Sequence, residues 1–143
     1  MRAEPQFLLT ALLGFALASP AGCSREPGSP CIQIGKPCAT CGMAVQEVRF
    51  AGLLRDEDED RQFDSIECLV RDSHVRSARV YLADYDQGDL RAAESLWIVK
   101  GDFPTPMGGG LAAFASIESA REVAERTRGR VSRFAELAEG AVR

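Results

Sequence analysis

Short segments in which apolar and polar residues alternate recur along the chain and predict strands. The alternation is clearest at 43–50, where Val45, Val48 and Phe50 are separated by polar residues, a pattern typical of a half-buried strand. Further runs rich in β-branched and aromatic residues indicate strands at 61–63, 80–85, 95–99 and 111–115. The sequence therefore predicts several short strands with turns between them.

A longer apolar period predicts helices between these strands. Asp64-Ser65 has the chemistry of a helix N-cap, and apolar residues then follow at helical spacing over 66–75. Ser116 is expected to cap a second helix over 117–127, which Gly129 ends, and a short third helix is expected at 134–138. The segment 103–110 holds two prolines and three glycines, so we expect a loop there. The order of elements predicts a small α+β domain of antiparallel strands with helices packed on the sheet.

Length, composition and charge limit the classes of function. The chain has 143 residues, of which 45% are hydrophobic and 27% are charged, as expected for one globular domain. Its formal net charge is −4. A mildly acidic surface provides no attraction for a phosphate backbone, and we expect no nucleic-acid partner.

The N-terminus has the pattern of an export signal. Arg2 precedes an apolar run at 7–18, which is shorter than the roughly 20 residues that span a bilayer and fits a signal peptide at 1–22. Cys23 follows Ala21-Gly22, as in bacterial lipoproteins, which predicts cleavage and lipidation at Cys23. Pro20 departs from that pattern, so cleavage nearby or an uncleaved anchor stays open. We expect a lipid-anchored protein on the cell membrane, outside the cytoplasm.

A segment rich in proline, glycine and serine separates this signal from the rest of the chain. It occupies 24–37, and its composition indicates a membrane tether at 23–37. The folded domain is then expected at 38–143.

Sulfur side chains are concentrated at one place in this domain. The sequence at 38–43 is Cys-Ala-Thr-Cys-Gly-Met, so Cys38, Cys41 and Met43 lie within six residues. Met107 follows a proline and precedes three glycines, and such a loop can present a thioether to a ligand. Thiolate together with thioether selects a soft ion, above all Cu(I). We therefore predict a copper site at Cys38, Cys41, Met43 and Met107.

Several alternatives stay open from the residues alone. Cys38 and Cys41 could form a disulfide in an oxidising compartment or act as a thiol–disulfide redox pair, and Met107 could be a packed turn residue. A zinc ribbon would need a second cysteine or histidine pair, whereas in the domain predicted at 38–143 only Cys68 and His74 remain, too far apart for that signature. We interpret Cys68 as a buried small hydrophobe and His74 as a solvated helix-end residue.

Four sequence blocks together resemble one family. They are Cys-Ala-Thr-Cys-Gly-Met-Ala-Val at 38–45, Phe-Asp-Ser-Ile-Glu-Cys at 63–68, Trp-Ile-Val at 97–99, and Pro-Thr-Pro-Met-Gly-Gly-Gly-Leu-Ala-Ala-Phe at 104–114. In this order they resemble NosL, the accessory lipoprotein of nitrous oxide reductase. The resemblance extends from the signal region to about residue 131.

This resemblance implies a function that composition alone does not. Members of the family are lipoproteins that face the periplasm, bind Cu(I), and resemble metallochaperones that supply copper for the maturation of nitrous oxide reductase. Their expected partners are the membrane surface, an ABC-transporter complex and nitrous oxide reductase maturation proteins, and no enzymatic activity is expected.

The resemblance also bears on the fold and on the copper ligands. It implies two strand-strand-helix halves, similar to those of organomercurial lyases. Its motifs point to Met107, Cys41 and Met43 as copper ligands, then Cys38, with Cys23 contributing a thioether if the tether folds back. The alternative function is a thiol–disulfide redox protein that uses Cys38 and Cys41.

Overall fold

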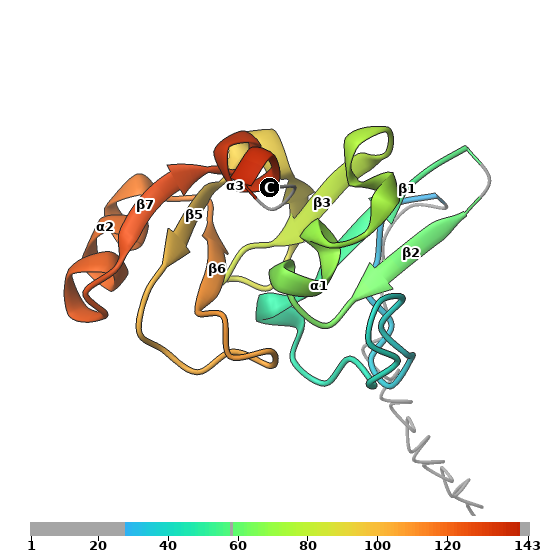
Figure 1. Cartoon of the computed structure of the whole chain (residues 1–143), viewed down its shortest axis with the longest axis horizontal. Helices are drawn as coiled ribbons and strands as arrows, with labels where there is room; N and C mark the ends of the chain where they lie inside the picture. Colours follow the sequence, from blue (N-terminus) through green and yellow to red (C-terminus); the bar gives the residue numbers. More distant parts are fainter. Residues whose placement is uncertain (1–27, 58, 141–143) are drawn as a thin grey trace, which may run out of the picture.

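Two antiparallel sheets lie beside each other in the computed structural model, which describes residues 28–57 and 59–140 (Figure 1). The first sheet has the strand order β2-β1-β3-β4, and the second has the order β6-β5-β7. The strands are β1 (Gly52–Arg55), β2 (Asp60–Phe63), β3 (Arg79–Ala83), β4 (Leu90–Ala92), β5 (Trp97–Lys100), β6 (Leu111–Phe114) and β7 (Arg130–Arg133).

Helices cover the sheets at positions that follow from local capping. The helices are α1 (Ile66–Val70), α2 (Ile117–Arg126) and α3 (Phe134–Gly140), with 3-10 turns η1 (Val48–Phe50), η2 (Ser73–Arg76) and η3 (Ala93–Ser95). The side chains of Ser65 and Ser116 accept hydrogen bonds from the first turns of α1 and α2, as predicted. The successions β1-β2-α1 and β5-β6-α2 confirm the α+β class and the two strand-strand-helix halves. Among the described residues, no helix combines the length and the apolar character needed to span a membrane.

The largest apolar cluster lies where α1 meets both sheets. Helix α1 contacts β1 and β2 of the first sheet and β6 of the second. Its buried residues pack with Leu54, Phe63, Leu82 and Ile98 of the strands. The sheets are also linked through the backbone, because Tyr85 N–H donates to the Ala113 carbonyl over 2.7 Å. Both halves therefore fix the position of α1, which carries Cys68.

Several segments differ from the sequence prediction. The helix predicted at 66–75 ends at Val70 and is followed by the separate turn η2. The strand predicted at 43–50 is absent; Val48–Phe50 form η1, and strand β1, which was not predicted, begins at Gly52. Val45 and Phe50 are both buried, but each lies in a different apolar cluster, so these apolar positions do not form one face of a strand. Strands β4 and β7 were not predicted, since both lie at sheet edges and their sequences are partly polar.

The segment before Cys38, predicted to be a membrane tether, packs in part on the first sheet. Ile32 is buried, and Pro37 forms an antiparallel bridge with Ala44. Gln33 N–H donates to the Gln62 side chain over 3.0 Å. Packing therefore begins several residues before Cys38. The predicted signal peptide at 1–22 and the lipidation of Cys23 lie outside the described residues and stay predictions.

Asp72 makes the stability of the first half depend on pH. Its side chain is 5% exposed, accepts a hydrogen bond from Arg61 over 2.6 Å and accepts one from the His74 backbone over 2.9 Å. Burial raises the pKa of Asp72, but the bonds from His74 and Arg61 outweigh it, so the pKa lies below its usual value. In the unfolded chain the pKa of an aspartate is about 3.9, so the lower pKa in the folded protein means that ionised Asp72 stabilises the fold at every pH above about 3.9. This stabilisation is lost as the pH falls from about 3.9 through the lower pKa of the folded state.

We expect Asp72→Asn to lower the unfolding free energy at pH 7 by about 1–3 kcal/mol, because hydrogen bonds to a charged group are lost. The loss should shrink as the pH falls below about 4, as measured by urea unfolding across that range. Asp102→Asn is the control, since its ion pair with Arg128 is exposed and contributes less than about 1 kcal/mol. Equal losses in both variants would contradict this role of Asp72.

Candidate metal centre

A tight turn places Cys38 and Cys41 on one side of the chain. Cys38 N–H donates to the Met43 carbonyl over 2.7 Å, and Gly42 N–H donates to the Cys38 carbonyl over 2.9 Å. Gly42 has φ +75, a left-handed conformation that glycine adopts without a Cβ penalty. The glycine in Cys-x-x-Cys-Gly is therefore required by the turn itself.

Two hydrogen bonds attach this turn to β2 and α1. Ala39 N–H donates to the Gln62 carbonyl over 2.9 Å. The Thr40 hydroxyl donates to the Cys68 carbonyl over 2.9 Å. The residues between the two cysteines thus hold the turn against the elements that carry the other half of the centre.

The junction between β2 and α1 supplies that other half. Ser65 acts as the N-cap, accepting a hydrogen bond from Cys68 N–H over 3.2 Å. Asp64, predicted together with Ser65 as the cap, instead accepts a long hydrogen bond from the Cys41 thiol, with 3.6 Å between Sγ and Oδ2. Asp64 is 3% exposed and Cys68 is fully buried.

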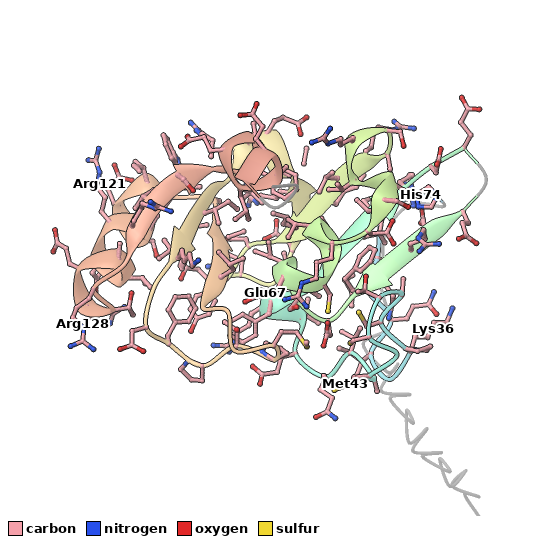
Figure 2. All side chains as sticks on the ribbon, viewed as in Figure 1. Lys36, Met43, Glu67, His74, Arg121 and Arg128 are labelled. Atoms are coloured by element: carbon pink, nitrogen blue, oxygen red, sulfur yellow. The ribbon has the colours of Figure 1, made fainter. Side chains whose placement is uncertain are left out.

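These segments bring three thiols and one carboxylate together. One ligand atom from each of Cys38, Cys41, Asp64 and Cys68 lies within 4.8 Å of all the others. The three cysteines are free thiols, so the disulfide alternative for Cys38 and Cys41 is not realised in this structure. Figure 2 shows sulfur atoms gathered between the labelled Glu67 and Met43. Four donors in so small a space can hold one metal ion.

Sequence reasoning left two members of this group out of the predicted ligand set. Cys68 is buried, as expected, but it adjoins two other thiols instead of apolar residues alone. The sequence pattern predicts only a capping role for Asp64. The block Phe-Asp-Ser-Ile-Glu-Cys at 63–68 contains both residues and is the signal that the sequence offers for them.

Burial controls the charge of the group. It raises the pKa of the Cys41 thiol, and the Met43 backbone partly offsets this effect. Burial also raises the pKa of Cys68, against a smaller opposing effect of the Ser65 hydroxyl. These two thiols are therefore protonated at neutral pH, and a metal ion must displace their protons to bind.

The predicted methionine ligands lie at the edge of this group. Met43 is 48% exposed and lies outside the strands. Met43, Asp64 and Pro106 line an open pocket of about 440 Å³. Met107, next to Pro106, is half-buried against the apolar cluster that contains Cys38 and Cys68. Their role as ligands stays a prediction.

The loop that carries Met107 is attached to α1 by a buried carboxylate. Glu67 is 6% exposed, and its Oε1 accepts hydrogen bonds from the Thr105 hydroxyl over 3.0 Å and from Leu111 N–H over 3.3 Å. Because Glu67 precedes Cys68, the position of this loop is coupled to the thiol on α1.

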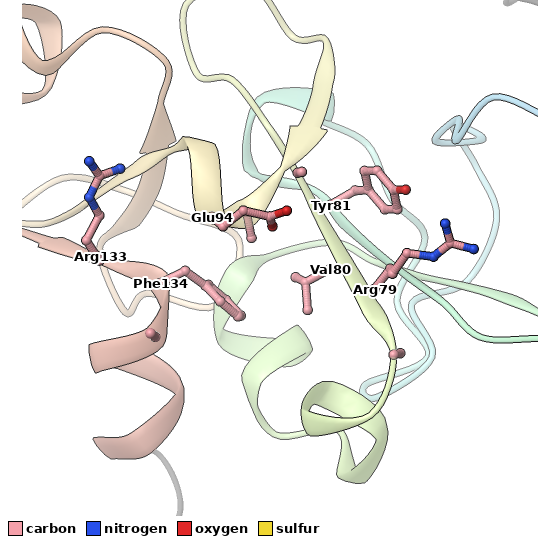
Figure 3. A pocket seen from close by; sticks show the side chains of 10 residues that line it. Arg79, Val80, Tyr81, Glu94, Arg133 and Phe134 are labelled. Carbon is pink, nitrogen blue, oxygen red and sulfur yellow. The ribbon is translucent and has the colours of Figure 1, made fainter.

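Other candidate features lie away from the thiols. His74 is bound to Asp72, with 2.8 Å between Nδ1 and the carboxylate. A pocket of about 520 Å³ lies between β3, η3 and the start of α3. Figure 3 shows its side chains, among them Val80, Glu94 and Phe134. None of the residues lining this pocket carries sulfur, so it is not part of the metal centre.

Comparisons with known proteins place the chain in a family. The family model NosL matches residues 31–142. A solved structure described as the copper chaperone NosL from Shewanella denitrificans has a TM-score of 0.64 and 21% sequence identity; the match covers 78% of this chain and 96% of that one. No curated protein matches the chain. The structural likeness shows a shared fold, and the family model spans most of the sequence, so this chain belongs to the NosL family.

Proposed function

We propose that this protein is a Cu(I)-binding metallochaperone that supplies copper for the maturation of nitrous oxide reductase. The observation that carries the proposal is the group of three free thiols around one buried carboxylate. Soft sulfur donors favour Cu(I) over hard cations. The solved relative is itself described as a copper chaperone, which supports the same cargo here.

Cys38, Cys41 and Cys68 supply the thiolates in this proposal. They come from a tight turn and from α1, two segments joined by the hydrogen bond between Thr40 and Cys68. The thioethers of Met43 and Met107 complete the site on its open side. Thioethers are neutral and cannot be lost to disulfide formation, so they suit a site that must release its ion.

Ligand exchange is the proposed mode of action. NosL is not an enzyme family, and transfer of an ion needs no covalent chemistry on a substrate. The pocket beside Met43, Asp64 and Pro106 provides access for a ligand of the receiving protein. That ligand would bind the ion while the thiols still hold it, and each thiol would regain its proton as it leaves the ion.

The cellular setting of the proposal comes from the sequence. Lipidation at Cys23 would hold the protein on the membrane surface, facing the periplasm. The copper would then be passed to nitrous oxide reductase maturation proteins with the help of an ABC-transporter complex.

The thiol–disulfide redox alternative is less well supported. A redox cysteine attacks as a thiolate and needs a lowered pKa, whereas burial raises the pKa of Cys41. The turn at 38–43 is also not followed by a helix whose N-terminus could stabilise a thiolate.

We expect Met107→Leu to weaken Cu(I) binding about tenfold, equal to about 1.4 kcal/mol. Leucine preserves the packing volume of methionine but lacks a sulfur donor. Affinity would be measured anaerobically by competition with a chromophoric Cu(I) chelator. Met43→Leu is the matched variant at the exposed position. If both variants bind Cu(I) as tightly as the wild-type protein, Met43 and Met107 are not copper ligands. A wild-type protein that binds no Cu(I) would refute the proposed function.

A further inference from the structure

We propose that Asp64 gives this centre a second metal specificity, namely a closed site of three thiolates and one carboxylate for a tetrahedral divalent ion such as Zn²⁺. The ion would compete with Cu(I) for the same thiols. The inference shares those thiols with the proposed function and deepens it by naming a second class of cargo.

The burial of Asp64 is the first observation. Its side chain is 3% exposed, Oδ2 accepts a hydrogen bond from the Cys41 thiol, the Cys68 thiol also interacts with this carboxylate, and Oδ1 is buried without a hydrogen-bond partner. Among the described residues, Asp64 also takes part in no ion pair with arginine, lysine or histidine. A buried carboxylate with an unpartnered oxygen is costly unless a cation neutralises it. The three neighbouring thiols identify a metal ion as that cation.

The donor set is the second observation. The four ligand atoms lie within 4.8 Å of one another, which allows them to converge on one ion after a small contraction. Zinc accepts thiolate and carboxylate ligands in tetrahedral sites. Cu(I) is softer and is satisfied by sulfur alone, so it gains little from Asp64.

Charge distinguishes the two ions further. Three thiolates and Asp64 together carry four negative charges when deprotonated. A divalent ion neutralises one more of these charges than Cu(I) does, and in a buried site that difference is large. Asp64 therefore favours the divalent ion, while the thioethers of Met43 and Met107 favour Cu(I), since zinc rarely accepts thioether ligands.

The test is a comparison of two ions and two sets of variants. The purified, reduced full chain would be titrated anaerobically with Zn²⁺ and with Cu(I), each against a chromophoric competitor, and with Co²⁺ to record thiolate-to-metal absorption. The variants are Asp64→Asn and the double variant Met43→Leu/Met107→Leu. Asp102→Asn is the control, because that exposed carboxylate pairs only with Arg128. Asp64→Ser serves if the asparagine variant does not fold.

The expected result is a crossed pattern. Asp64→Asn should weaken Zn²⁺ binding tenfold or more, because the loss of even an outer-shell partner costs about 10- to 100-fold, and should change Cu(I) affinity by less than about threefold. The double methionine variant should do the opposite. X-ray absorption at the zinc edge of the wild-type protein should report three sulfur neighbours and one oxygen.

Two outcomes would overturn the inference. One is unchanged Zn²⁺ affinity in Asp64→Asn, and the other is a wild-type chain that binds Cu(I) but neither Zn²⁺ nor Co²⁺. Either leaves the copper proposal standing. Asp64-dependent Zn²⁺ binding without Cu(I) binding would instead overturn the copper proposal and uphold this inference.

Discussion

Replacing Cys38 and Cys41 together with serine is expected to weaken Cu(I) binding by on the order of a thousandfold or more. A thousandfold corresponds to about 4 kcal/mol. The reason is that two of the three thiols grouped around Asp64 are removed, and a hydroxyl is a poor ligand for a soft ion. Anaerobic competition with a Cu(I) chelator measures the loss. Serine is close in size to cysteine, so the turn and its hydrogen bond from Gly42 should remain.

Thermal unfolding with and without Cu(I) distinguishes cysteines that bind the metal from cysteines that only pack in the fold. If the thiols are ligands, Cu(I) should raise the unfolding temperature of the wild-type protein and not that of the serine variant. If the two residues only pack, the metal-free variant should lose stability while copper still raises the unfolding temperature of both proteins. Wild-type Cu(I) affinity in the variant would place the copper elsewhere on the chain.

The largest effect on stability is expected from Gly110→Ala. Gly110 has φ +66, and a Cβ there would overlap the carbonyl oxygen of Gly101. The two glycines close the base of the loop between β5 and β6, since Gly101 N–H donates to the Gly110 carbonyl over 2.9 Å. A left-handed non-glycine residue alone costs about 1–3 kcal/mol. With the overlap added, we expect a loss above about 3 kcal/mol in urea unfolding.

Gly108→Ala is the matched control in the same loop. Gly108 also has a left-handed φ, of +70, but a Cβ there would meet no atom within 4 Å. Its loss should stay near the cost of the backbone conformation, about 1–2 kcal/mol. Gly110→Ala should additionally weaken Cu(I) binding, because a displaced loop moves Met107. Equal losses in the two variants would show that the close approach to Gly101 does not matter.

Local chemistry made part of this fold predictable. The serine caps at Ser65 and Ser116 and the glycine-rich loop at 103–110 act within a few residues, so their positions follow from the sequence. The edge strands β4 and β7 do not, because their pairing with β3 and β5 is set by the whole sheet. The apolar residues at 43–50 predicted a strand, but Val45 and Phe50 pack into different clusters and Val48–Phe50 form the turn η1.

Only Cys38 and Cys41, which are close in sequence, could be predicted as members of the metal centre. Cys38 and Cys41 share one turn, and their spacing indicates a common ligand. Asp64 and Cys68 join them through packing between segments more than 20 residues apart, for example through the bond from Thr40 to the Cys68 carbonyl. No periodicity in the sequence reports such a contact, and a buried cysteine on a helix is far more often part of a core.

That same bond between the turn and α1 has a consequence for the lifetime of the protein. An ion bound by Cys38, Cys41 and Cys68 would crosslink the turn to α1, which are otherwise joined by the Thr40–Cys68 hydrogen bond and by packing in the apolar cluster that contains Cys38 and Cys68. An ion that binds only the folded state stabilises it and so lowers the population of partly unfolded forms. Proteases cleave these partly unfolded forms. Under the proposed function, the metal-free chain is therefore the form more exposed to degradation, so turnover would remove metal-free chains before loaded ones.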